Sequence, residues 1–217
     1  MCNSKIPVSD PSGTVESAGV ESRKRPSYLL QAWLVIFLSA FYAVILVTVQ
    51  INLRPRIEEN QRQATYSQIP SLIAGADPSK TVELVIQGTD GKPARILQVF
   101  NAEGNHIGWL FPGVGQGFGD VISLIIGLDP QAETITGLFV LEQKETPGLG
   151  NFIVDEPFRS QFIGKGVSMP LTAKAGVPTA PHEIQALTGA TISSKAVCDI
   201  VNNSIANYRA SALAAVK

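Results

Sequence analysis

The hydrophobic pattern divides the chain into segments with different periodicities. Residues 1–26 are rich in Ser, Gly and Pro, a composition that predicts a disordered tail because it cannot bury a core. Residues 27–53 contain no charged side chain, and a helix of that length, at about 1.5 Å per residue, crosses the hydrocarbon core of a bilayer. From residue 81 onward, short apolar segments alternate with turn signals. We therefore expect a transmembrane helix over 27–53, a stalk or linker over 54–80 and a domain over 81–217.

The apolar segment has one alternative, a cleaved signal peptide. The run is longer than the apolar region of a signal peptide, and no persuasive small-residue cleavage site follows it. Tyr28 and Trp33 near its start suit the interfacial aromatic belt of a membrane span. The basic cluster 23–25 precedes the run, which favours a cytoplasmic N-terminus. This places the domain on the outer, periplasmic face of the inner (cytoplasmic) membrane, held by a single pass.

Within the domain, the spacing of apolar residues and turns predicts an antiparallel meander. The dipeptide Asp90-Gly91 is a hairpin signal between two apolar runs. The apolar positions of 193–208 recur every three or four residues, which predicts an amphipathic C-terminal helix. The fold class is therefore α+β: a mainly antiparallel sheet with a C-terminal helix. Strands are expected at 82–86, 94–100, 106–111, 121–128, 134–141, 168–173 and 183–187, with a short helix within 155–162.

Composition excludes several classes of function. The net charge of −1 comes without a basic stripe, so no nucleic-acid partner is expected. Cys2 and Cys198 are too few for a disulfide framework, and His106 and His182 lie in no ligand cluster, so no metal site is expected. The sequence also lacks a nucleophile, base and oxyanion constellation. The chain is thus not expected to catalyse a group transfer alone.

The segment Thr188-Gly189-Ala190-Thr191-Ile192-Ser193-Ser194 places hydroxyls and a glycine at the expected start of the C-terminal helix. The first turn of a helix has unpaired N–H groups and a partial positive charge, so a phosphate at Thr191 would meet backbone donors from residues 193–195. Gly189 lets the backbone bend close to such an anion. The alternative is an ordinary N-cap, because Ser and Thr oxygens accept hydrogen bonds from a first turn.

Two further segments have both a structural and a binding interpretation. The loop Glu145-Thr146-Pro147-Gly148-Leu149-Gly150 is either a Pro-Gly turn after a strand or a loop that presents Thr146 and Leu149 to a ligand. The glycine-rich segment 113–120 satisfies neither the P-loop nor the dinucleotide spacing. It is either a plain connection or a tight loop that lets another group approach the backbone.

The segment 188–194 resembles the (S/T)GATx(S/T) attachment motif of the FMN-binding domain family. In that family, a flavin transferase links FMN through its phosphate to the second threonine, here Thr191, with Ser193 as the rival acceptor. The family also has an E-T-P-G-L-G loop near the flavin, which residues 145–150 reproduce in full, and a glycine-rich segment that helps to form the pocket. An acid usually stands three residues before the first hydroxyl. Here that position is Gln185, with Glu183 two residues earlier.

Over roughly residues 30–208, the chain is similar to the G subunit of Rnf complexes and, more loosely, to the C subunit of sodium-pumping NADH:quinone reductases. The resemblance implies an electron carrier that works with other membrane subunits of an ion-translocating redox complex. The competing hypothesis is a membrane-anchored binding module without redox activity. The flavin-binding residues that the resemblance implies are Thr191 as the covalent acceptor, with Thr188, Gly189, Ala190, Ser193, Ser194, Glu145, Thr146, Gly148 and Leu149.

Overall fold

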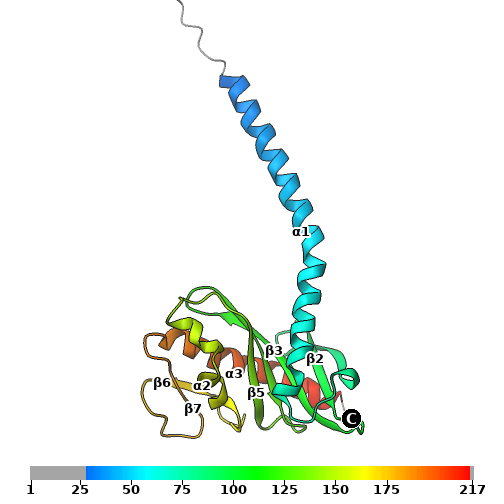
Figure 1. The fold of residues 1–217 in the computed structure, drawn as a ribbon, viewed down its shortest axis with the longest axis vertical. Coiled ribbons are helices and arrows are strands. Elements are labelled where there is room, and N and C mark those ends of the chain that lie inside the picture. Colours follow the sequence, from blue (N-terminus) through cyan, green and yellow to red (C-terminus); the bar gives the residue numbers. More distant parts are fainter. Residues whose placement is uncertain (1–27, 216–217) are drawn as a thin grey trace, which may run out of the picture. The chain divides into compact units, whose positions relative to one another are not determined.

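Figure 1 shows the computed structural model, which describes residues 28–215. The expected disordered tail and the basic cluster 23–25 lie outside the described residues. A five-stranded sheet forms the centre of the domain, followed by short helical turns, a second small sheet and a long helix. The helices and strands are α1 (Tyr28–Leu72), β1 (Val82–Gln87), β2 (Pro93–Phe100), β3 (His106–Gln116), β4 (Val121–Leu128), β5 (Ile135–Glu142), α2 (Glu156–Arg159), β6 (Thr172–Lys174), β7 (Glu183–Gln185) and α3 (Thr191–Ala214).

The expected N-terminal apolar helix is confirmed. Within α1, Ala32–Ile57 has a mean hydropathy of 2.5 and none of the most apolar stretch is buried in protein, so this segment is long and apolar enough to cross a membrane. The described residues separate into two compact units, with the division between Leu53 and Arg54. The second unit contains the last turns of α1, where Ile69 and Leu72 are buried against the sheet.

The central sheet is an antiparallel meander, as the turn signals predict. The strand order is β1-β2-β3-β4-β5, so each strand pairs with its neighbours in sequence. The hairpin at Asp90-Gly91 is present: Gly91 has φ +76° and the Lys92 N–H donates to Asp90 Oδ1 at 3.0 Å. The fold class expected from the sequence is therefore confirmed.

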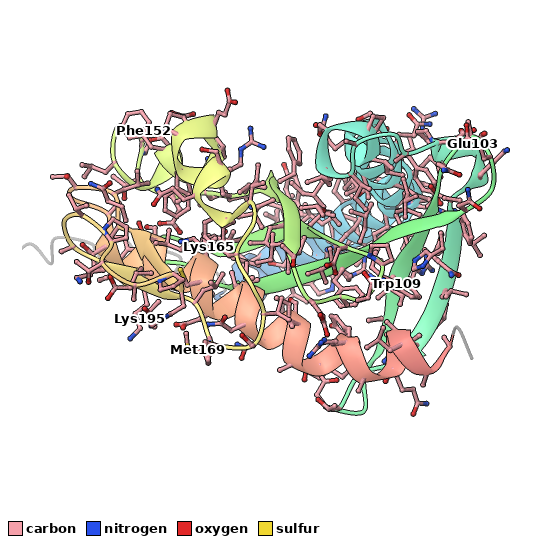
Figure 2. All side chains as sticks on the ribbon, turned by 90° about the horizontal axis from the view of Figure 1, so that it is seen from below. Glu103, Trp109, Phe152, Lys165, Met169 and Lys195 are labelled. Carbon is pink, nitrogen blue, oxygen red and sulfur yellow. The ribbon has the colours of Figure 1, made fainter. Side chains whose placement is uncertain are left out.

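The two faces of the sheet carry different hydrophobic clusters. Along β3, Trp109 and Phe111 point to the face that α3 covers, while Leu110 between them points to the face that the end of α1 covers. This alternation is the two-residue period of a strand that is buried on both faces. In Figure 2, Trp109 lies between the sheet and α3, whereas Lys195 on α3 points outward. The sheet thus holds α3 in a fixed position by its apolar stripe.

Several expected boundaries differ from the structure, and the differences at β3, β6 and α3 have identifiable consequences. β3 continues to Gln116 and includes Gly113 and Gly115. These glycines let α3 pack closely on the strand, since a Cβ on Gly115 would be 2.5 Å from Ile200 Cγ1. The strand expected at 168–173 is reduced to β6, which pairs with β7 in parallel. α3 begins at Thr191, two residues earlier than the apolar periodicity indicates, and continues to Ala214. The last difference bears directly on the expected attachment site.

Candidate functional site

The N-terminus of α3 begins without a side-chain cap. Its N-cap residue is Ala190 (φ −135°, ψ 41°), which makes no side-chain capping bond, and Thr191 is the first helical residue. Gly189 precedes it with φ +80°, a left-handed conformation that favours glycine. The interpretation of Thr191 as an ordinary N-cap therefore does not fit. Its side chain is exposed at a helix end that Ser, Thr or Asp would normally stabilise.

The backbone N–H groups that have no acceptor within the helix at this end are those of Thr191, Ile192 and Ser193. The first hydrogen bond of the helix runs from the Ser194 N–H to the Ala190 carbonyl at 3.0 Å. The three preceding N–H groups therefore have no acceptor within the helix. The N–H groups of Ser194 and Lys195, expected to face a phosphate, belong instead to the helical ladder. The first turn of α3 contains no acidic residue, so its positive end is not neutralised from within that turn.

The Ser194 side chain holds the turn together. Its hydroxyl is fully buried, donates to the Ala190 carbonyl at 2.9 Å and accepts from the Leu187 N–H at 3.0 Å. These two bonds close the loop 187–190 over the first turn of α3. Ser194 thus positions the N-cap, and it does not line the neighbouring cavity.

Ser193 points to the other side of the turn, where it meets a buried carboxylate. Its hydroxyl donates to Glu145 Oε2 at 2.6 Å, and the Gly119 N–H donates to Glu145 Oε1 at 3.1 Å. Glu145 is 5% exposed and Ser193 is 2% exposed. Gly150 makes room for this contact, since a Cβ there would lie 2.8 Å from Ser193 Oγ and 2.9 Å from Glu145 Oε2. One carboxylate therefore joins the glycine-rich loop, the E-T-P-G-L-G loop and α3.

These three segments enclose a cavity of about 500 Å³. That volume lies within the range of roughly 300–1,000 Å³ that is usual for small-molecule and cofactor sites. Its wall is mainly apolar, and its polar groups come from the backbone and hydroxyls of the first turn of α3 and from Thr146. The residues that line it are Phe118, Thr146, Leu149, Gly150, Gly189, Ala190, Thr191, Ile192 and Ser193.

The structure brings together six of the ten residues expected at the site. Those lining the cavity are Thr146, Leu149, Gly189, Ala190, Thr191 and Ser193. The other four, Glu145, Gly148, Thr188 and Ser194, do not line it. Glu145 and Ser194 lie behind the wall and support it. Gly148 has φ +77°, so it supplies the bend that brings Leu149 over the cavity.

Phe118, Gly150 and Ile192 line the cavity without having been predicted individually. Phe118 is 62% exposed and Ile192 is 60% exposed, and a large apolar side chain at a loop tip or in a first helical turn is a signal of a contact surface. Phe118 lies in the glycine-rich loop, and Ile192 occupies the variable position of the 188–194 motif. The sequence therefore placed Phe118 and Ile192 in two segments suspected of binding, but it did not show that they line the cavity.

Comparison with known proteins agrees with this geometry. The FMN-binding domain family matches residues 117–206, a range that contains all nine residues lining the cavity. The chain is 29% identical over 168 residues to the G subunit of the ion-translocating oxidoreductase complex of Methanosarcina acetivorans, covering 77% of this chain and 85% of that protein. The class is thus that of FMN-binding domain proteins with an N-terminal apolar helix.

Two further relatives refine the assignment. The G subunit of the Na(+)-translocating ferredoxin:NAD(+) oxidoreductase complex of Acetobacterium woodii is 32% identical over 169 residues, covering 75% of this chain and 76% of that protein. The C subunit of the Na(+)-translocating NADH-quinone reductase of Vibrio vulnificus is 30% identical over 149 residues, covering 62% of this chain and 56% of that protein. This chain belongs to the family of G subunits of Rnf-type ion-translocating oxidoreductase complexes, with a more distant similarity to the C subunits.

Proposed function

We propose that this chain relays electrons through an FMN group attached by a phosphoester bond to Thr191, as one component of an Rnf-type membrane complex. The observation that carries the proposal is the position of Thr191, an exposed residue that has no capping role, begins a helix without a side-chain cap and lines the cavity. Membership of the G-subunit family and the match to the FMN-binding domain support the cofactor.

Thr191 is a better acceptor than Ser193 for two physical reasons. Ser193 is 2% exposed and its hydroxyl already donates its hydrogen to Glu145 at 2.6 Å, so a modifying enzyme cannot reach it without breaking a buried, charge-assisted bond. Thr191 is exposed, and both residues line the same cavity. Burial and hydrogen bonding therefore select between two otherwise similar groups.

The lining of the cavity suits the two chemical parts of FMN. The N–H groups of Thr191, Ile192 and Ser193 offer donors to a phosphate at the positive end of α3. Phe118, Leu149 and Ile192 offer apolar surface to the flavin ring, and Thr146 offers a hydroxyl at its edge. When bound, FMN supplies reversible one- and two-electron redox chemistry, and the protein orients it and limits its contact with water.

The same proposal extends to partners and location. A carrier needs a donor and an acceptor, and the A. woodii relative is named for ferredoxin and NAD. We infer that this chain works with other membrane subunits, that a flavin transferase attaches the FMN, and that the domain lies on the outer face of the membrane. The chain does not turn over substrates alone, because it supplies a relay and not a substrate site.

Mass spectrometry of the membrane-extracted chain, produced together with a flavin transferase, tests the proposal. Trypsin cleavage after Lys174 and Lys195 gives a peptide that should carry one FMN mass, with fragmentation placing it on Thr191. Thr191→Ala should lose in-gel flavin fluorescence while the chain stays folded. Ser193→Ala should keep a detectable but reduced signal, because it keeps the acceptor and loses only the bond to Glu145. An unmodified peptide from the native host would leave the non-redox binding module as the better description. Covalent flavin retained by Thr191→Ala would overturn Thr191 as the acceptor.

A further inference from the structure

Another cavity lies between the last turns of α1 and the central sheet, and it shares no lining residue with the FMN site. Its volume is about 350 Å³, which is also within the usual range for small-molecule sites. All of its lining residues belong to the compact unit that begins at Arg54. Neither the attachment of FMN nor the proposed electron relay uses this space.

One face of α1 forms a wall of this cavity. Its lining residues Pro55, Glu59, Arg62 and Tyr66 recur every three or four positions, so they lie on the same side of the helix. The apolar segment of α1 ends at Ile57. If that segment crosses the membrane, Glu59 lies only about 3 Å beyond it along the helix. The headgroup layer of a bilayer extends roughly 5–7 Å beyond the hydrocarbon, so the cavity begins at the depth of the lipid headgroups.

The sheet forms an apolar floor beneath this wall. Leu97, Leu110 and Ile125 are buried on β2, β3 and β4, and Pro112 and Leu141 beside them are half-buried. The charged side chains of the lining belong to α1, β1 and β2 at its rim. An apolar floor below a charged rim suits a ligand that is polar at one end and apolar at the other.

Three of the charged side chains form a cluster. Glu83 on β1 pairs through Oε2 with Arg62 Nη2 and through Oε1 with Arg95 Nε, the second contact at 3.4 Å. The Glu83 side chain is 19% exposed, whereas those of Arg62 and Arg95 are 49% and 70% exposed. Arg95 Nη1 and Nη2 make no hydrogen bond to any of the described residues. Glu83 therefore holds two guanidinium groups in place while donors of Arg95 stay free for a ligand.

The charges on the rim fall into two parts. Arg62 and Arg95 together with Glu83 have a net charge of +1, because two positive charges face one negative charge. Glu59, three residues before Arg62 on the same face of α1, adds a separate negative charge. Its one hydrogen bond among the described residues, from Gln63 Nε2, is 3.4 Å long. A ligand that matches both parts has one negative group and one positive group close together.

We propose that this cavity binds the headgroup of a phospholipid that has both a phosphodiester and a primary ammonium group, as phosphatidylethanolamine has. The phosphodiester meets Arg95 and Arg62, the ammonium meets Glu59, and the glycerol end rests on the apolar floor. Phosphatidylglycerol fits less well, because it has no positive group for Glu59. Phosphatidylcholine fits less well, because its quaternary ammonium has no N–H to donate to that carboxylate.

Native mass spectrometry of the full chain in a neutral detergent tests the proposal, with the three phospholipids added separately and with identical acyl chains. Phosphatidylethanolamine should bind at one saturable site per chain. Phosphatidylglycerol and phosphatidylcholine should bind about fivefold more weakly, the effect of losing one charged contact at an exposed site. Equal binding of phosphatidylethanolamine and phosphatidylcholine, or tighter binding of phosphatidylglycerol, would overturn the proposal.

Variants assign the two parts of the headgroup. Arg95→Gln should weaken the binding of both phosphatidylethanolamine and phosphatidylglycerol by about fivefold, and Arg95→Lys should lose less because it keeps the charge. Glu59→Gln should weaken the binding of phosphatidylethanolamine alone. Arg209→Gln removes another arginine with a 3.5 Å ion pair, on α3, and is the matched control. Equal binding by Arg95→Gln and Arg209→Gln, with circular dichroism showing that both are folded, would overturn the proposal.

A photoreactive amino acid in place of Leu141 identifies the occupant of the cavity in native membranes. Irradiation should give a crosslink to phospholipid, because Leu141 lines the floor. A crosslink to another polypeptide in place of lipid would overturn the proposal by showing that a partner subunit covers the cavity, and the absence of any lipid crosslink would overturn it too. Neither readout depends on FMN at Thr191, so a failure of the flavin proposal is seen separately.

Discussion

Ser193 and Glu145 are 48 residues apart in sequence, and the Ser193 hydroxyl donates to the Glu145 carboxylate at 2.6 Å in the interior of the domain. The same carboxylate accepts from the Gly119 N–H, so a single side chain connects the three segments around the FMN cavity. Because Thr191 is two residues from Ser193 on the same helical turn, this contact also fixes the place at which Thr191 is presented.

Glu145→Gln should therefore loosen the N-terminus of α3. The amide keeps the size of the side chain but cannot accept from both donors as strongly, and we expect a loss of about 1–3 kcal/mol in the free energy of unfolding. Covalent flavin should decrease. In the flavin that remains, the midpoint potential should rise, because a buried negative charge beside the cavity disfavours reduction. Denaturant titration, in-gel fluorescence and a redox titration measure the three effects.

Glu142→Gln is the matched control for that change, since Glu142 ends the strand that leads to the same loop and its side chain is 52% exposed. It should leave stability and flavin content unchanged, because its only ion pair, with Lys144, is a 3.9 Å surface contact among the described residues. Equal effects of the two substitutions would show that Glu145 acts only through net charge and not through its bonds to Ser193 and Gly119.

Alanine substitutions at two glycines with the same backbone conformation distinguish the effect of backbone strain from the effect of crowding at the site. Gly189 (φ +80°) and Gly148 (φ +77°) both adopt the left-handed region, so alanine at either should cost about 1–2 kcal/mol. A Cβ on Gly189 would lie 2.9 Å from Leu149 Cδ2 in the cavity wall, whereas a Cβ on Gly148 meets nothing within 4 Å.

We therefore expect Gly189→Ala to reduce flavin attachment well beyond Gly148→Ala at similar thermal stability. Melting temperature and flavin absorbance per chain provide the comparison. If both variants lose flavin equally, the crowding of Leu149 is not what matters at this position.

The regular elements were predictable because local signals determine them. The Asp90-Gly91 hairpin and the run of β4 at Val121–Leu128 follow from turn chemistry and apolar patterning, and both occur where expected. The start of α3 was not predictable from periodicity, because Thr191 and Ile192 are exposed and add nothing to the apolar stripe. What begins the helix there is a tertiary effect: Ser194 and Ser193 are held from opposite sides by Leu187 and Glu145.

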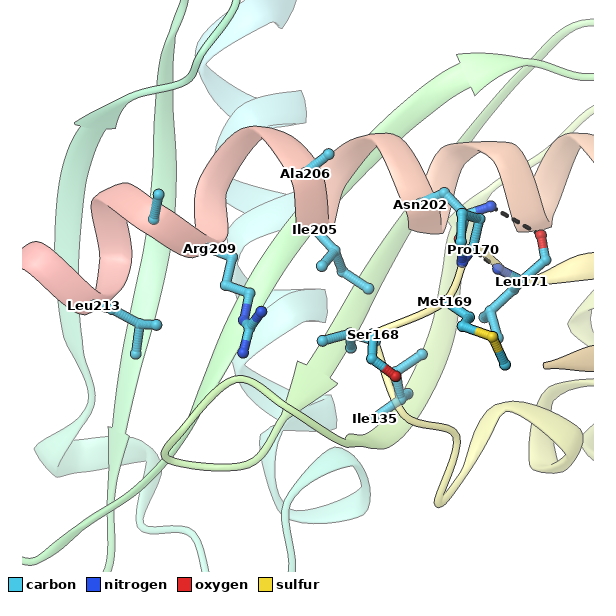
Figure 3. Close-up of a pocket in the computed structure, with 12 residues that line it drawn as sticks. Ile135, Ser168, Met169, Pro170, Leu171, Asn202, Ile205, Ala206, Arg209 and Leu213 are labelled. Atoms are coloured by element: carbon cyan, nitrogen blue, oxygen red, sulfur yellow. Dashed lines mark hydrogen bonds between the residues drawn. The ribbon is translucent and has the colours of Figure 1, made fainter. Parts of the chain in front are cut away.

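For the cavity too, some features were predictable from the sequence and others depend on tertiary contacts. The two motifs around Thr191 and Glu145 are visible in the sequence, and the structure places both segments at one site. The sequence did not distinguish the residues that face the cavity from those that support it, because that depends on which side of a turn each one occupies. Glu145 was expected beside the flavin but lies behind Ser193. A cavity along the C-terminal half of α3, shown in Figure 3, likewise depends on residues distant in sequence, because Asn202 holds Leu171 at its edge.

Cys198 should be inert in the folded domain. It is fully buried on α3, and desolvation, with a smaller contribution from the charge of Asp199, raises the pKa of its thiol from 9.0 to about 12. The thiolate is the reactive form, so iodoacetamide at pH 8 should leave Cys198 unmodified until denaturant is added. Peptide mass spectrometry before and after unfolding gives the result. Rapid native labelling would mean that α3 opens from the sheet.

The orientation of the chain is a prediction from the basic cluster 23–25 that precedes the apolar segment. A reporter active only outside the cytoplasm, fused after Lys217, should be active, and a cytoplasmic reporter at the same position should be silent. The reverse pattern would place the FMN cavity on the cytoplasmic side. If the three basic residues help to set the orientation, replacing them with Gln should give a mixture of chains inserted in the two opposite orientations.

The stability of the β6–β7 region should depend on acid pH through Glu183. Hydrogen bonds from the Thr179 N–H, followed by that from Lys174, lower the pKa of the Glu183 carboxyl from 4.5 to about 2. A carboxyl whose pKa is lower in the folded state stabilises that state above its unfolded pKa. This contribution is lost as the pH falls through the folded value. The loss should therefore occur between about pH 4.5 and pH 2.

Hydrogen exchange of the 172–185 backbone, measured across that pH range and corrected for intrinsic rates, reports this loss. Protection should decrease on acidification in the parent. Glu183→Gln should start with lower protection at pH 7 and change less between pH 4.5 and pH 2, because its amide does not titrate. Lys174→Gln removes the cation but keeps the Thr179 and Ala180 backbone donors, so it should retain part of the pH dependence. A parent and a Glu183→Gln variant with the same pH profile would show that Glu183 is not the group responsible.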